Sequence, residues 1–383
     1  MNRLVPKKIY ILAGEASGDL HGANLIKHLR NISKEPLEIY GVGGDKMREI
    51  GVRDFYDLAH FHVTGLTDAV KKVPQYRRAA AVILSNIQKV KPDLVVLIDN
   101  PGFNLHMAKK IHALGIPIVY FIAPQVWAWA PKRVLKIKKY VKKVLVVFEF
   151  EKKFFEDHGV PVVWVGHPLK DLIDEQIRRT QNLEKRKGGI ITLLPGSRIG
   201  ELKMLFSIFL EAAKLIAKKI PDVSFEVVQA PTMPLSVYKK FLDASALPIR
   251  LVADNGYAVI QNSDLAIACS GTVTLECALL GTPVIIANRG TLLTYLMAKT
   301  VLRVDCLGLP NLILGQKKFP EFLQYNATPK KIADEAIRIL NDEKTYQQMK
   351  EDCLEVSKRL GPTGASRRAA NEILALLTPR IIT

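Results

Sequence analysis

Short apolar runs recur along the chain and alternate with stretches in which apolar residues return every three or four positions. Most runs are apolar at consecutive positions, a pattern typical of parallel strands that are covered on both faces. The intervening stretches have the length and spacing of crossover helices, so we predict an α/β fold of doubly wound sheets. Strands are expected at residues 8–13, 37–43, 93–99, 116–123, 143–150 and 160–166, and then at 189–196, 223–230, 249–253, 265–271 and 282–287.

A charged stretch over residues 166–188 interrupts this alternation, and a new apolar run follows it. We therefore expect one α/β domain over residues 1–167 and a second over 168–359. The last segment, 360–383, is helical in pattern and is expected to pack back on the first domain or on a partner. Two Rossmann-like domains that face a cleft fit the GT-B architecture, an analogy of fold that does not by itself specify the chemistry.

The 383 residues include 55 Lys and Arg against 37 Asp and Glu, for a formal charge of +18. Such an excess favours an anionic partner: nucleic acid, acidic lipid headgroups or phosphorylated substrates. The four cysteines form no C-x-x-C pair or zinc-spaced cluster, so we expect reduced thiols, no metal and a cytosolic protein. The first apolar run is too short for a signal peptide, and no segment reaches the roughly 18 apolar residues of a membrane span. Any membrane association is therefore expected to be peripheral.

The segment Ile9–Leu25, IYILAGEASGDLHGANL, is glycine-rich like a nucleotide-binding loop but has different spacing. A dinucleotide loop reads G-x-G-x-x-G, whereas here Glu15 and Asp19 would repel a pyrophosphate. Carboxylates suit hydroxyl groups, as acceptors or as a base. We predict a loop that handles a hydroxyl-bearing acceptor, with His21 close by; the alternative is that Asp19 only caps a helix. To the acceptor side we assign Gly14, Glu15, Ser17, Gly18 and Asn104.

Phosphate groups are better accommodated at two turns in the second half of the chain. In LLPGSRIGELKML, residues 193–205, a buried strand turns through Gly196 and Ser197 into a helix, with Arg198 at its entry. Free N–H groups, the positive end of the helix dipole and a bidentate guanidinium together suit an anion. The alternative is an ordinary capped turn with a solvated arginine.

The second turn lies in ACSGTVTLECALLGTPVI, residues 268–285, where Ser270, Gly271 and Thr272 open an apolar helix. Small residues and free N–H groups let a diphosphate come close. Glu276 falls about one turn further on, where a lone buried carboxylate is costly unless it is bonded, and a ribose diol would satisfy it. The alternative partner is neighbouring backbone. Together the two turns predict a metal-free nucleoside-diphosphate site that stabilises a departing diphosphate, and hence glycosyl transfer from a sugar nucleotide.

An ordered set of motifs is more specific than any single turn. The chain contains, in this order, GEASGDLHG, YGVGGDKM, VTGL, LIDNPGFN, APQVWAWAPKR, VGHPL, LPGSRIGEL, SGTVTLECAL and LPNLILG. Over nearly its whole length it resembles the lipid-A-disaccharide synthases, the family 19 glycosyltransferases.

The resemblance implies a metal-independent, inverting GT-B enzyme with no cofactor. Its donor would be UDP-2,3-diacylglucosamine and its acceptor the 6-hydroxyl of 2,3-diacylglucosamine 1-phosphate (lipid X), giving a β-1,6 link and UDP in lipid A biosynthesis. It also implies a peripheral protein on the cytoplasmic face of the bacterial inner membrane and suggests homodimers. By the same resemblance, the UDP site holds Arg198, Ser270, Gly271, Thr272 and Glu276, and Asn311 of LPNL lines the cleft.

A carboxylate is expected to take the proton of the acceptor hydroxyl as its oxygen attacks the anomeric carbon, a contribution of about 10²–10⁴-fold. Asp99, at the end of a buried strand, is the first candidate, and Asp19 assisted by His21 is the second. Two departures from the family bear on this choice. Many members carry a second acid where this chain has Gly102, and many read PFE where this chain has Glu149-Phe150-Glu151.

Two basic clusters are candidates for contact with an anionic membrane, where each basic residue contributes about 1 kcal/mol. The stretch 60–73 is interpreted as an amphipathic contact for acyl chains. The alternative for each cluster is a solvated helix face. The first cluster comprises Lys132, Arg133, Lys136, Lys139 and Lys143, and the second comprises Lys71, Lys72, Arg77 and Arg78.

Other functions fit less of the sequence. A nucleic-acid binder is suggested by charge alone, but no binding motif occurs, and no nucleic-acid partner is expected. A different GT-B enzyme acting on UDP-N-acetylglucosamine, either a 2-epimerase or a lipid II glycosyltransferase, is the alternative, although an epimerase needs no acyl-binding surface. The carboxylates of the glycine loop disfavour an oxidoreductase. Periodicity does not decide whether Tyr120, Trp127 and Trp129 belong to the core or to a cleft wall.

Overall fold

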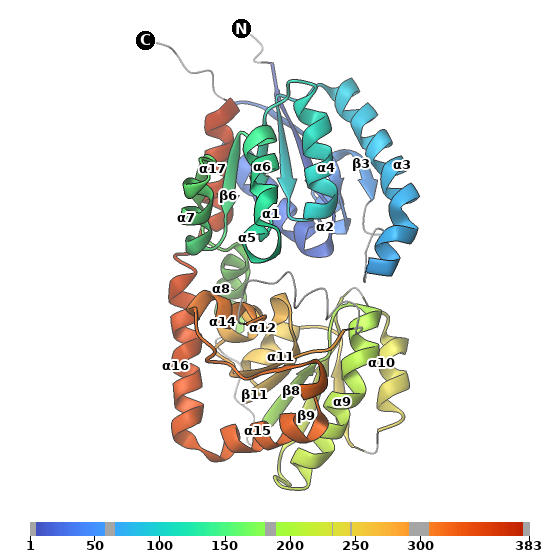
Figure 1. The fold of residues 1–383 in the computed structure, drawn as a ribbon, viewed down its shortest axis with the longest axis vertical. Helices are drawn as coiled ribbons and strands as arrows, with labels where there is room; N and C mark the ends of the chain where they lie inside the picture. The colour runs from blue at the N-terminus through green and yellow to red at the C-terminus, as the bar shows by residue number, and fades with distance from the viewer. Residues whose placement is uncertain are drawn as a thin grey trace. The chain divides into compact units, whose positions relative to one another are not determined.

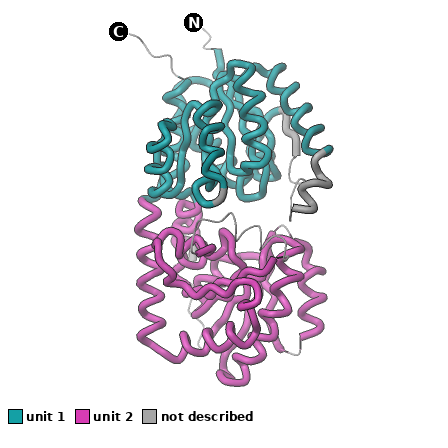
Figure 2. Tube along the Cα trace, viewed as in Figure 1, with its two compact units in different colours: residues 1–168, 362–383 teal, residues 169–361 magenta. Residues whose placement is uncertain are grey.

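The computed structural model describes residues 5–57, 66–180, 189–231, 233–245, 247–290 and 306–377. The chain divides into two compact units, residues 1–168 with 362–383 and residues 169–361, which Figure 2 shows in two colours. Each unit is built on one open parallel sheet with flanking helices (Figure 1). The predicted doubly wound α/β fold is therefore confirmed.

The first unit contains a seven-stranded parallel sheet in the order β3-β2-β1-β4-β5-β6-β7. All five residues of β4 are buried, as expected for a central strand with helices on both sides. The edge strand β3 is not among the strands predicted from the sequence, because RDFYD contains no apolar run. The strands are β1 (Lys7–Ala13), β2 (Leu37–Gly43), β3 (Arg53–Asp57), β4 (Leu94–Ile98), β5 (Ile118–Phe121), β6 (Lys143–Val146) and β7 (Val162–Trp164).

Helices cover both faces of this sheet. Val95 and Leu97 of β4 share a core with residues of α3, α4 and α6, whereas Gly18 of α1 faces Ile98, whose side chain points to the opposite face. The C-terminal helix α17 packs against α1 on that second face. The described helices of this unit are α1 (Ala16–Ile32), α2 (Asp45–Glu49), α3 (Leu66–Val90), α4 (Pro101–His112), α5 (Val126–Trp129), α6 (Val134–Tyr140), α7 (Glu149–Asp157) and α17 (Ala365–Leu377), with the short 3-10 helix η1 (Pro131–Arg133).

Two polar contacts fasten α17 to the first unit. Lys143 of β6 forms a 2.8 Å ion pair with Glu372. The guanidinium of Arg368 donates to the carbonyl oxygen of Val165 at 2.8 Å. Lys143 therefore lies on a strand and is paired, so it does not belong to the basic cluster in which the sequence analysis placed it.

The second unit contains a six-stranded parallel sheet in the order β10-β9-β8-β11-β12-β13. Its central strands β8 and β11 are buried throughout, and its edge strand β13 is, like β3, a short strand that the sequence did not predict. The strands are β8 (Ile190–Leu194), β9 (Ser224–Val228), β10 (Ile249–Val252), β11 (Leu265–Cys269), β12 (Val284–Asn288) and β13 (Glu321–Leu323). The described helices are α8 (Pro168–Thr180), α9 (Ile199–Ala217), α10 (Leu235–Leu242), α11 (Gly256–Gln261), α12 (Thr272–Leu279), α14 (Leu309–Leu314), α15 (Pro329–Asn341) and α16 (Glu343–Arg359), with the 3-10 helix η2 (Gln324–Asn326).

In both sheets the strand order reverses beside the first strand of the unit. β1 pairs with β2 on one side and with β4 on the other, and β8 is flanked in the same way by β9 and β11. Ligands of open α/β sheets bind outside the carboxyl ends of the strands at such a reversal point. The residues that follow β1 and β4 are Gly14 and Asp99, and those that follow β8 and β11 are Pro195 and Ser270. The topology thus places the predicted motifs at both reversal points.

Candidate active site

The glycines after β1 let helix α1 approach the sheet closely. A Cβ atom at Gly14 would overlap the side-chain amide of Asn100, and Gly18 is buried against β1 and β4. Glu15 occupies the N-cap position of α1 with extended backbone and is partly exposed, and Ser17 is exposed. The glycine spacing therefore serves packing, while Glu15 and Ser17 reach solvent at the reversal point.

Asp19 is buried, and its carboxylate caps a neighbouring helix. Oδ1 accepts hydrogen bonds from the backbone N–H groups of Gly44 at 2.8 Å and Met47 at 3.0 Å, and Oδ2 accepts one from Lys46 at 2.9 Å. These N–H groups lie at the start of α2, so Asp19 joins the motif GEASGDLHG to the motif YGVGGDKM. Asp19 is thus a helix cap, as the alternative interpretation held, but the helix it caps is α2 rather than its own helix α1.

Asp99 follows β4 in a left-handed backbone conformation with φ of +47°, and Asn100 follows with φ of +44°. Such angles are uncommon for residues other than glycine, so the surrounding structure must hold them. The carbonyl oxygen of Asp99 accepts hydrogen bonds from the hydroxyl of Tyr120 at 2.7 Å and from Nδ2 of Asn104 at 2.8 Å. Tyr120 and Asn104 are both buried, so they shape the turn that carries Asp99, and Asn104 does not face solvent as an acceptor-side residue.

His21 and His167 form a buried pair of rings at the same end of the first sheet. Their ring centroids are 6.5 Å apart and the rings are nearly perpendicular. Burial lowers the pKa of His21 to about 4, and burial together with the neighbouring His21 lowers the pKa of His167 to about 3. A histidine with so low a pKa is a weak base at neutral pH, which weighs against His21 as an assistant to Asp19.

The turns after β5 and β6 meet through Trp127 and Glu151. The indole Nε1 of Trp127 donates to Oε1 of Glu151 at 3.1 Å, and Oε2 accepts the backbone N–H of Phe148 at 3.2 Å. The ring of Trp127 contacts Phe150 edge-on at 5.0 Å between centroids, and Phe150 stacks on Phe148 at 5.4 Å. A row of aromatic rings therefore extends from α5 to α7. Trp127 is half-buried, so it contributes both to the core and to the surface.

In the second unit, the turn after β8 is closed by a carboxylate. Gly196 has φ of +125°, and a Cβ atom there would lie 2.6 Å from Cβ of Glu201. Glu201, in the first turn of α9, accepts the backbone N–H of Ser197 at 2.9 Å and Nη1 of Arg198 at 3.2 Å. Arg198 is therefore exposed but paired, and the carboxylate of Glu201 engages the groups that the sequence assigns to phosphate.

The turn after β11 lies next to this one. Gly271 occupies the N-cap position of α12, and both Gly271 and Thr272 are exposed. The hydroxyl of Ser270 donates to the carbonyl oxygen of Leu307 at 3.4 Å. The thiol of Cys269, just before the turn, is buried, which raises its pKa, and it lies within the electrostatic reach of both Glu201 and Arg198. The two predicted phosphate-binding turns are therefore neighbours.

Glu276 is held by a tyrosine from another helix. The hydroxyl of Tyr257 in α11 donates to Oε1 of Glu276 at 3.3 Å. Burial raises the pKa of Glu276 to about 7, and the bond from Tyr257 partly opposes this rise. The partner of Glu276 is thus a side chain rather than the neighbouring backbone that the alternative interpretation named.

Asn311 has no exposed surface, contrary to the expectation that it lines a cleft. Its Nδ2 donates to the carbonyl oxygen of Phe319 and to Oε1 of Glu321, both at 2.8 Å. Its Oδ1 accepts two backbone N–H groups, also at 2.8 Å. Glu321 in turn accepts the N–H groups of Leu307 and Gly308 at 2.9 Å. Asn311 therefore orders the loop between α14 and β13.

The two reversal points differ in charge. The first sheet carries the carboxylates of Glu15 and Asp99 there, and the second carries the guanidinium of Arg198 beside the N-terminal ends of α9 and α12. Carboxylates accept hydrogen bonds from hydroxyl groups, whereas a guanidinium and helix N-termini bind phosphate. The arrangement is chemically able to bind a sugar hydroxyl in the first unit and a diphosphate in the second.

Three residues of these sites are absent from the sequence prediction: Glu151, Glu201 and Tyr257. Glu201 lies three residues after Arg198, and this helical spacing is a signal that can be read from sequence. Glu151 and Tyr257 act through contacts between distant segments, for which the sequence offers no comparable signal. The side chains of 60–73, with Lys71 and Lys72, and that of Trp129 lie outside the described residues, so the predictions for them stay predictions.

Comparison with known sequences points to one family. A family profile described as lipid-A-disaccharide synthetase matches residues 9–374. The lipid-A-disaccharide synthase of Geobacter metallireducens is 38% identical over 375 residues, which is 97% of both chains. That of Coxiella burnetii is 38% identical over 347 residues, which is 89% of this chain and 91% of the other.

Comparison with solved structures concerns the fold alone, because sequence identity is low. The UDP-GlcNAc 2-epimerase of Neisseria meningitidis bound to UDP-GlcNAc gives a TM-score of 0.69 at 14% identity and covers 96% of this chain and 100% of the other. MurG of Acinetobacter baumannii gives a TM-score of 0.56 at 15% identity, with 97% and 100% covered. Both are proteins of the GT-B type, which agrees with the predicted architecture.

Proposed function

Because the chain belongs to the lipid-A-disaccharide synthetase family and is therefore a glycosyltransferase, we propose that it joins two acylated glucosamine units. The donor is UDP-2,3-diacylglucosamine, and the acceptor is the 6-hydroxyl of 2,3-diacylglucosamine 1-phosphate. The acceptor oxygen forms a bond to the anomeric carbon of the donor, the bond from that carbon to UDP breaks, and the configuration inverts. The products are a β-1,6-linked disaccharide 1-phosphate, UDP and the proton released by the hydroxyl.

The observation that carries this proposal is the contrast in charge between the two strand-reversal points. In the second unit, the diphosphate is proposed to bind Arg198 and the N–H groups at the starts of α9 and α12. Glu276 is proposed to accept the hydroxyls of the ribose, since a carboxylate has lone pairs for both. Arg198 and the two helix ends would then stabilise the negative charge that develops on the leaving UDP.

In the first unit, we take Asp99 as the general base that receives the acceptor proton. Two observations favour Asp99 over Asp19. The carboxylate of Asp19 already accepts three backbone N–H groups at 2.8 to 3.0 Å, and its proposed assistant His21 has a low pKa. Asp99 stands at the carboxyl end of a central strand, on a turn that Asn104 and Tyr120 hold in a strained conformation.

The experiment is an assay of the purified full-length chain with both substrates in detergent. We expect UDP and a tetraacyl disaccharide 1-phosphate in equal amounts, measured by a coupled UDP assay and mass spectrometry. Arg198→Ala should weaken UDP binding and slow the chemical step, whereas the control Lys203→Ala, an exposed residue on the same helix, should do neither. Absence of product, or conversion of UDP-N-acetylglucosamine alone, would overturn the proposal. The second result would support the epimerase alternative, which the family membership does not favour.

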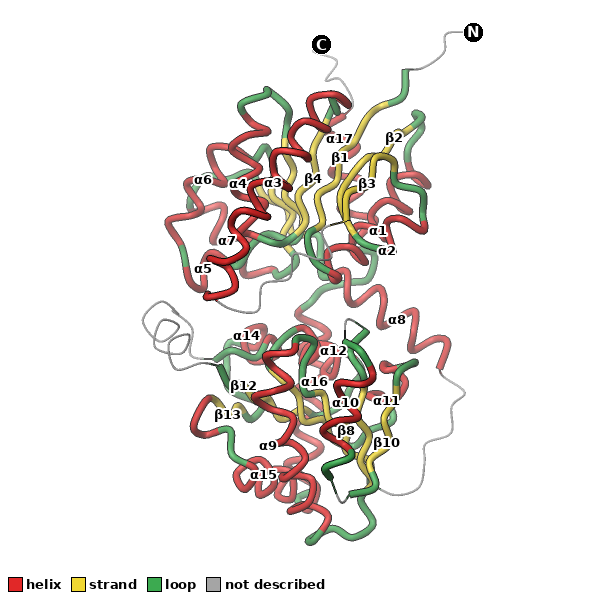
Figure 3. Tube along the Cα trace, turned by 90° about the vertical axis from the view of Figure 1, so that its right-hand side faces the viewer, coloured by secondary structure: helices red, strands yellow, loops and turns green. Residues whose placement is uncertain are grey.

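We further propose that the face formed by α3, α4 and α6 rests on the anionic cytoplasmic surface of the inner membrane. The three helices lie side by side on the first sheet (Figures 1 and 3). No Asp or Glu occurs among the described side chains of these helices or η1, and Val82 and Leu135 are exposed among them, at 51% and 62%. The exposed basic residues are Arg77, Arg78, Lys89, Lys109, Lys132, Lys136, Lys138 and Lys139.

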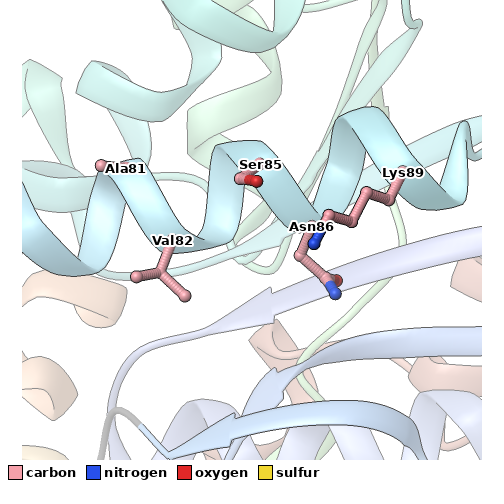
Figure 4. Close-up of a pocket in the computed structure, with 5 residues that line it drawn as sticks. All are labelled: Ala81, Val82, Ser85, Asn86 and Lys89. Carbon is pink, nitrogen blue, oxygen red and sulfur yellow. The ribbon is translucent and has the colours of Figure 1, made fainter.

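The same face carries a hollow of about 360 Å³. Figure 4 shows the lining residues Ala81, Val82, Ser85, Asn86 and Lys89 along α3, with Val82 and Asn86 pointing to the same side of the helix. They all come from one helix, and the hollow includes none of the residues at the strand-reversal points, so we assign it to the basic face rather than to the active site. Among the described residues, no helix has the length and apolarity that crossing a bilayer requires.

Vesicle sedimentation tests this contact. The protein should bind vesicles containing phosphatidylglycerol and not vesicles of phosphatidylcholine alone. Reversing two charges, Lys136→Glu with Lys139→Glu, should lower the partition coefficient at least tenfold, because each basic residue contributes about 1 kcal/mol near an anionic surface. The control, Lys239→Glu with Lys240→Glu, reverses two exposed charges on α10 in the second unit. An equal loss in both double variants would contradict a contact through α6.

A further inference from the structure

Glu151 is a carboxyl group that the proposed chemistry does not use, although it is completely buried. Burial of an unpaired ionisable group is unfavourable by several kcal/mol. Here both oxygens have donors: Oε1 accepts the indole N–H of Trp127, and Oε2 accepts the backbone N–H of Phe148. The first bond connects the turn after β5 to the turn after β6, and the second lies within the turn after β6. A cap for α7 requires only the second of them, so the bond to Trp127 needs a separate explanation.

The position of Glu151 relates it to the proposed base. β4, β5 and β6 are consecutive neighbours in the sheet. The N–H of Asp99 donates to the carbonyl oxygen of Phe121, and the N–H of Ile122 donates to that of Leu145, so the turns after the three strands lie in a row. Asp99 follows the first of these strands, Trp127 the second and Glu151 the third. The indole is therefore fixed by Glu151 in the turn next to the base.

The charges around Glu151 are few. Burial raises the pKa of Glu151 to about 7, the bonds from Trp127 and from backbone N–H groups oppose this, and the charge of Asp99 raises it further. Beyond Phe148 lies His167, which is neutral at pH 7 because burial lowers its pKa to about 3. The charge of Arg133 in η1 lowers the pKa of Tyr120, whose hydroxyl donates to the carbonyl oxygen of Asp99. Lys152 and Lys153, the next residues of α7, are exposed to solvent. Among the described residues, Asp99 is thus the carboxylate whose charge raises the pKa of Glu151.

We propose that Glu151 is a positioning residue of the acceptor side: it fixes the indole of Trp127 and, through its own charge, sets the basicity of Asp99. This rests on the proposed function, in which Asp99 is the base. Electrostatic coupling is reciprocal, so an ionised Glu151 makes Asp99 a stronger base and a protonated Glu151 makes it a weaker one. Glu151 itself neither donates nor accepts the reacting proton.

The consequence is a step in the rate of the chemical reaction near neutral pH. As pH rises through 7, Glu151 ionises and Asp99 becomes more basic, so the rate constant of a single turnover should rise. For an intermediate Brønsted dependence, we expect an increase of a few-fold in this rate constant. Saturating donor is required in this measurement, because Glu276 also titrates near pH 7 and affects donor binding.

Two variants of the full-length chain test the proposal. Glu151→Gln should abolish the step and leave a rate equal to that of the wild type below pH 6. Trp127→Phe removes the indole N–H that stabilises the charged form of Glu151, so the step should move to higher pH by about half a unit to one unit. The control Glu149→Gln changes an exposed carboxylate two residues away and should keep the wild-type profile.

The outcomes separate the failure of this inference from that of the proposed function. If the wild type forms no disaccharide, or if Asp99→Asn retains full turnover, the proposed function or its base fails, and this inference fails with it. If Asp99→Asn is inactive but both variants keep the wild-type step in position and size, the inference alone is wrong. If Glu151 only caps α7, the Glu151→Gln variant should be less stable than the wild type but should keep the step in its pH profile. If Glu151→Gln does not fold, Trp127→Phe tests the inference alone: a step at higher pH supports it, and a step at the wild-type pH overturns it.

Discussion

The carboxylate of Asp19 accepts the backbone N–H of Gly44 at 2.8 Å, across 25 positions of sequence. This bond places one glycine-rich motif on another and leaves no room for a larger residue at Gly44, where a Cβ atom would lie 2.7 Å from Oδ2. An acidic residue in a glycine loop is therefore not by itself a sign of catalysis. Its oxygens must first be accounted for, and those of Asp19 are occupied at the start of α2.

Asp19→Asn should lower the free energy of unfolding by about 1–3 kcal/mol, because the new amide turns a donor toward the N–H of Lys46 and leaves that N–H unsatisfied. Urea denaturation measures this loss. Asp45→Asn, an exposed residue in the same helix α2, is the control and should change little. Unchanged stability combined with lost turnover would instead make Asp19 the base.

Glu201→Gln should tighten UDP binding about fivefold. In the structure Glu201 binds the N–H of Ser197 and the guanidinium of Arg198, the groups that are proposed to bind the diphosphate. UDP must therefore displace a partly exposed ion pair and a charged hydrogen bond, at a cost of about 1 kcal/mol that is absent in the variant. Isothermal titration with UDP measures the change. The control is Glu211→Gln, which removes a similar pair with Lys214 on the same helix. Weaker binding in Glu201→Gln would mean that Glu201 orients Arg198 toward phosphate.

Tyr257→Phe should raise the KM for the donor about threefold at pH 7. The hydroxyl of Tyr257 lowers the pKa of Glu276 against the effect of burial, so its loss leaves less carboxylate to accept the ribose hydroxyls. The difference in KM between the variant and the wild type should grow below pH 7 and vanish above about pH 8.5, where Glu276 is ionised in both proteins. Steady-state kinetics across this range measure it, and Tyr325→Phe, which alters an exposed tyrosine, is the control.

Gly102→Asp should raise the free energy of unfolding by about 1 kcal/mol. Gly102 lies in the first turn of α4, and a Cβ atom there meets no atom within 4 Å. An acid near a helix N-terminus is favourable, and replacing glycine in a helix adds to the gain. Thermal unfolding compares this variant with Gly102→Lys, in which the helix dipole opposes the new charge. Equal stability of the two variants would show that the dipole plays no part here.

The first unit should lose stability in acid. The pKa values of His21 and His167 are lowered from 6.5 to about 4 and about 3. The unfolded chain therefore binds more protons below pH 6.5, and each histidine lowers the free energy of unfolding by about 1.4 kcal/mol per pH unit. Glu151 acts in the opposite direction between pH 7 and 4.5, because its raised pKa makes the folded state bind the proton first. Because two histidines oppose one acid, the free energy of unfolding of the first unit should fall as the pH falls.

Urea denaturation from pH 7 to pH 4.5 measures this slope. His21→Phe should make it shallower, since one buried histidine no longer takes up a proton on unfolding. His112→Phe, at an exposed position, should leave the slope as in the wild type. An identical slope in all three proteins would show that these histidines do not govern acid stability.

Much of the fold was predictable because central parallel strands leave a local signal. The residues of β4 and β11 are apolar at every position, and those of β8 are apolar except for the buried Thr192, so these strands are visible in sequence. The edge strands β3 and β13 were missed, since a short strand at an edge needs no continuous apolar run. The same locality explains why the turns after β1, β8 and β11 could be predicted from their glycines and small residues, and the turn after β4 from the acid that ends its apolar run.

Some assignments of single residues were wrong, because they depended on residue type and spacing alone. Asn311 was expected at a surface and is enclosed by its own loop. Lys143 was expected in a basic cluster with the residues of α6, but it begins β6, as the strand prediction for 143–150 held, and is paired with Glu372 across most of the chain length. In each case the partner comes from a contact that the local pattern does not encode.

The sequence by itself determined two doubly wound sheets and the turns that end their central strands, because burial on both faces and helix starts leave signals within a few neighbouring residues. Only the tertiary structure decided how the acids in and near these turns are used. Asp19 is committed to α2, Glu151 to Trp127 and Glu276 to Tyr257, through hydrogen bonds between segments 19 to 28 residues apart. Such bonds depend on which oxygen and which N–H or O–H the packed elements bring within about 3 Å, and no periodicity along the chain records that distance.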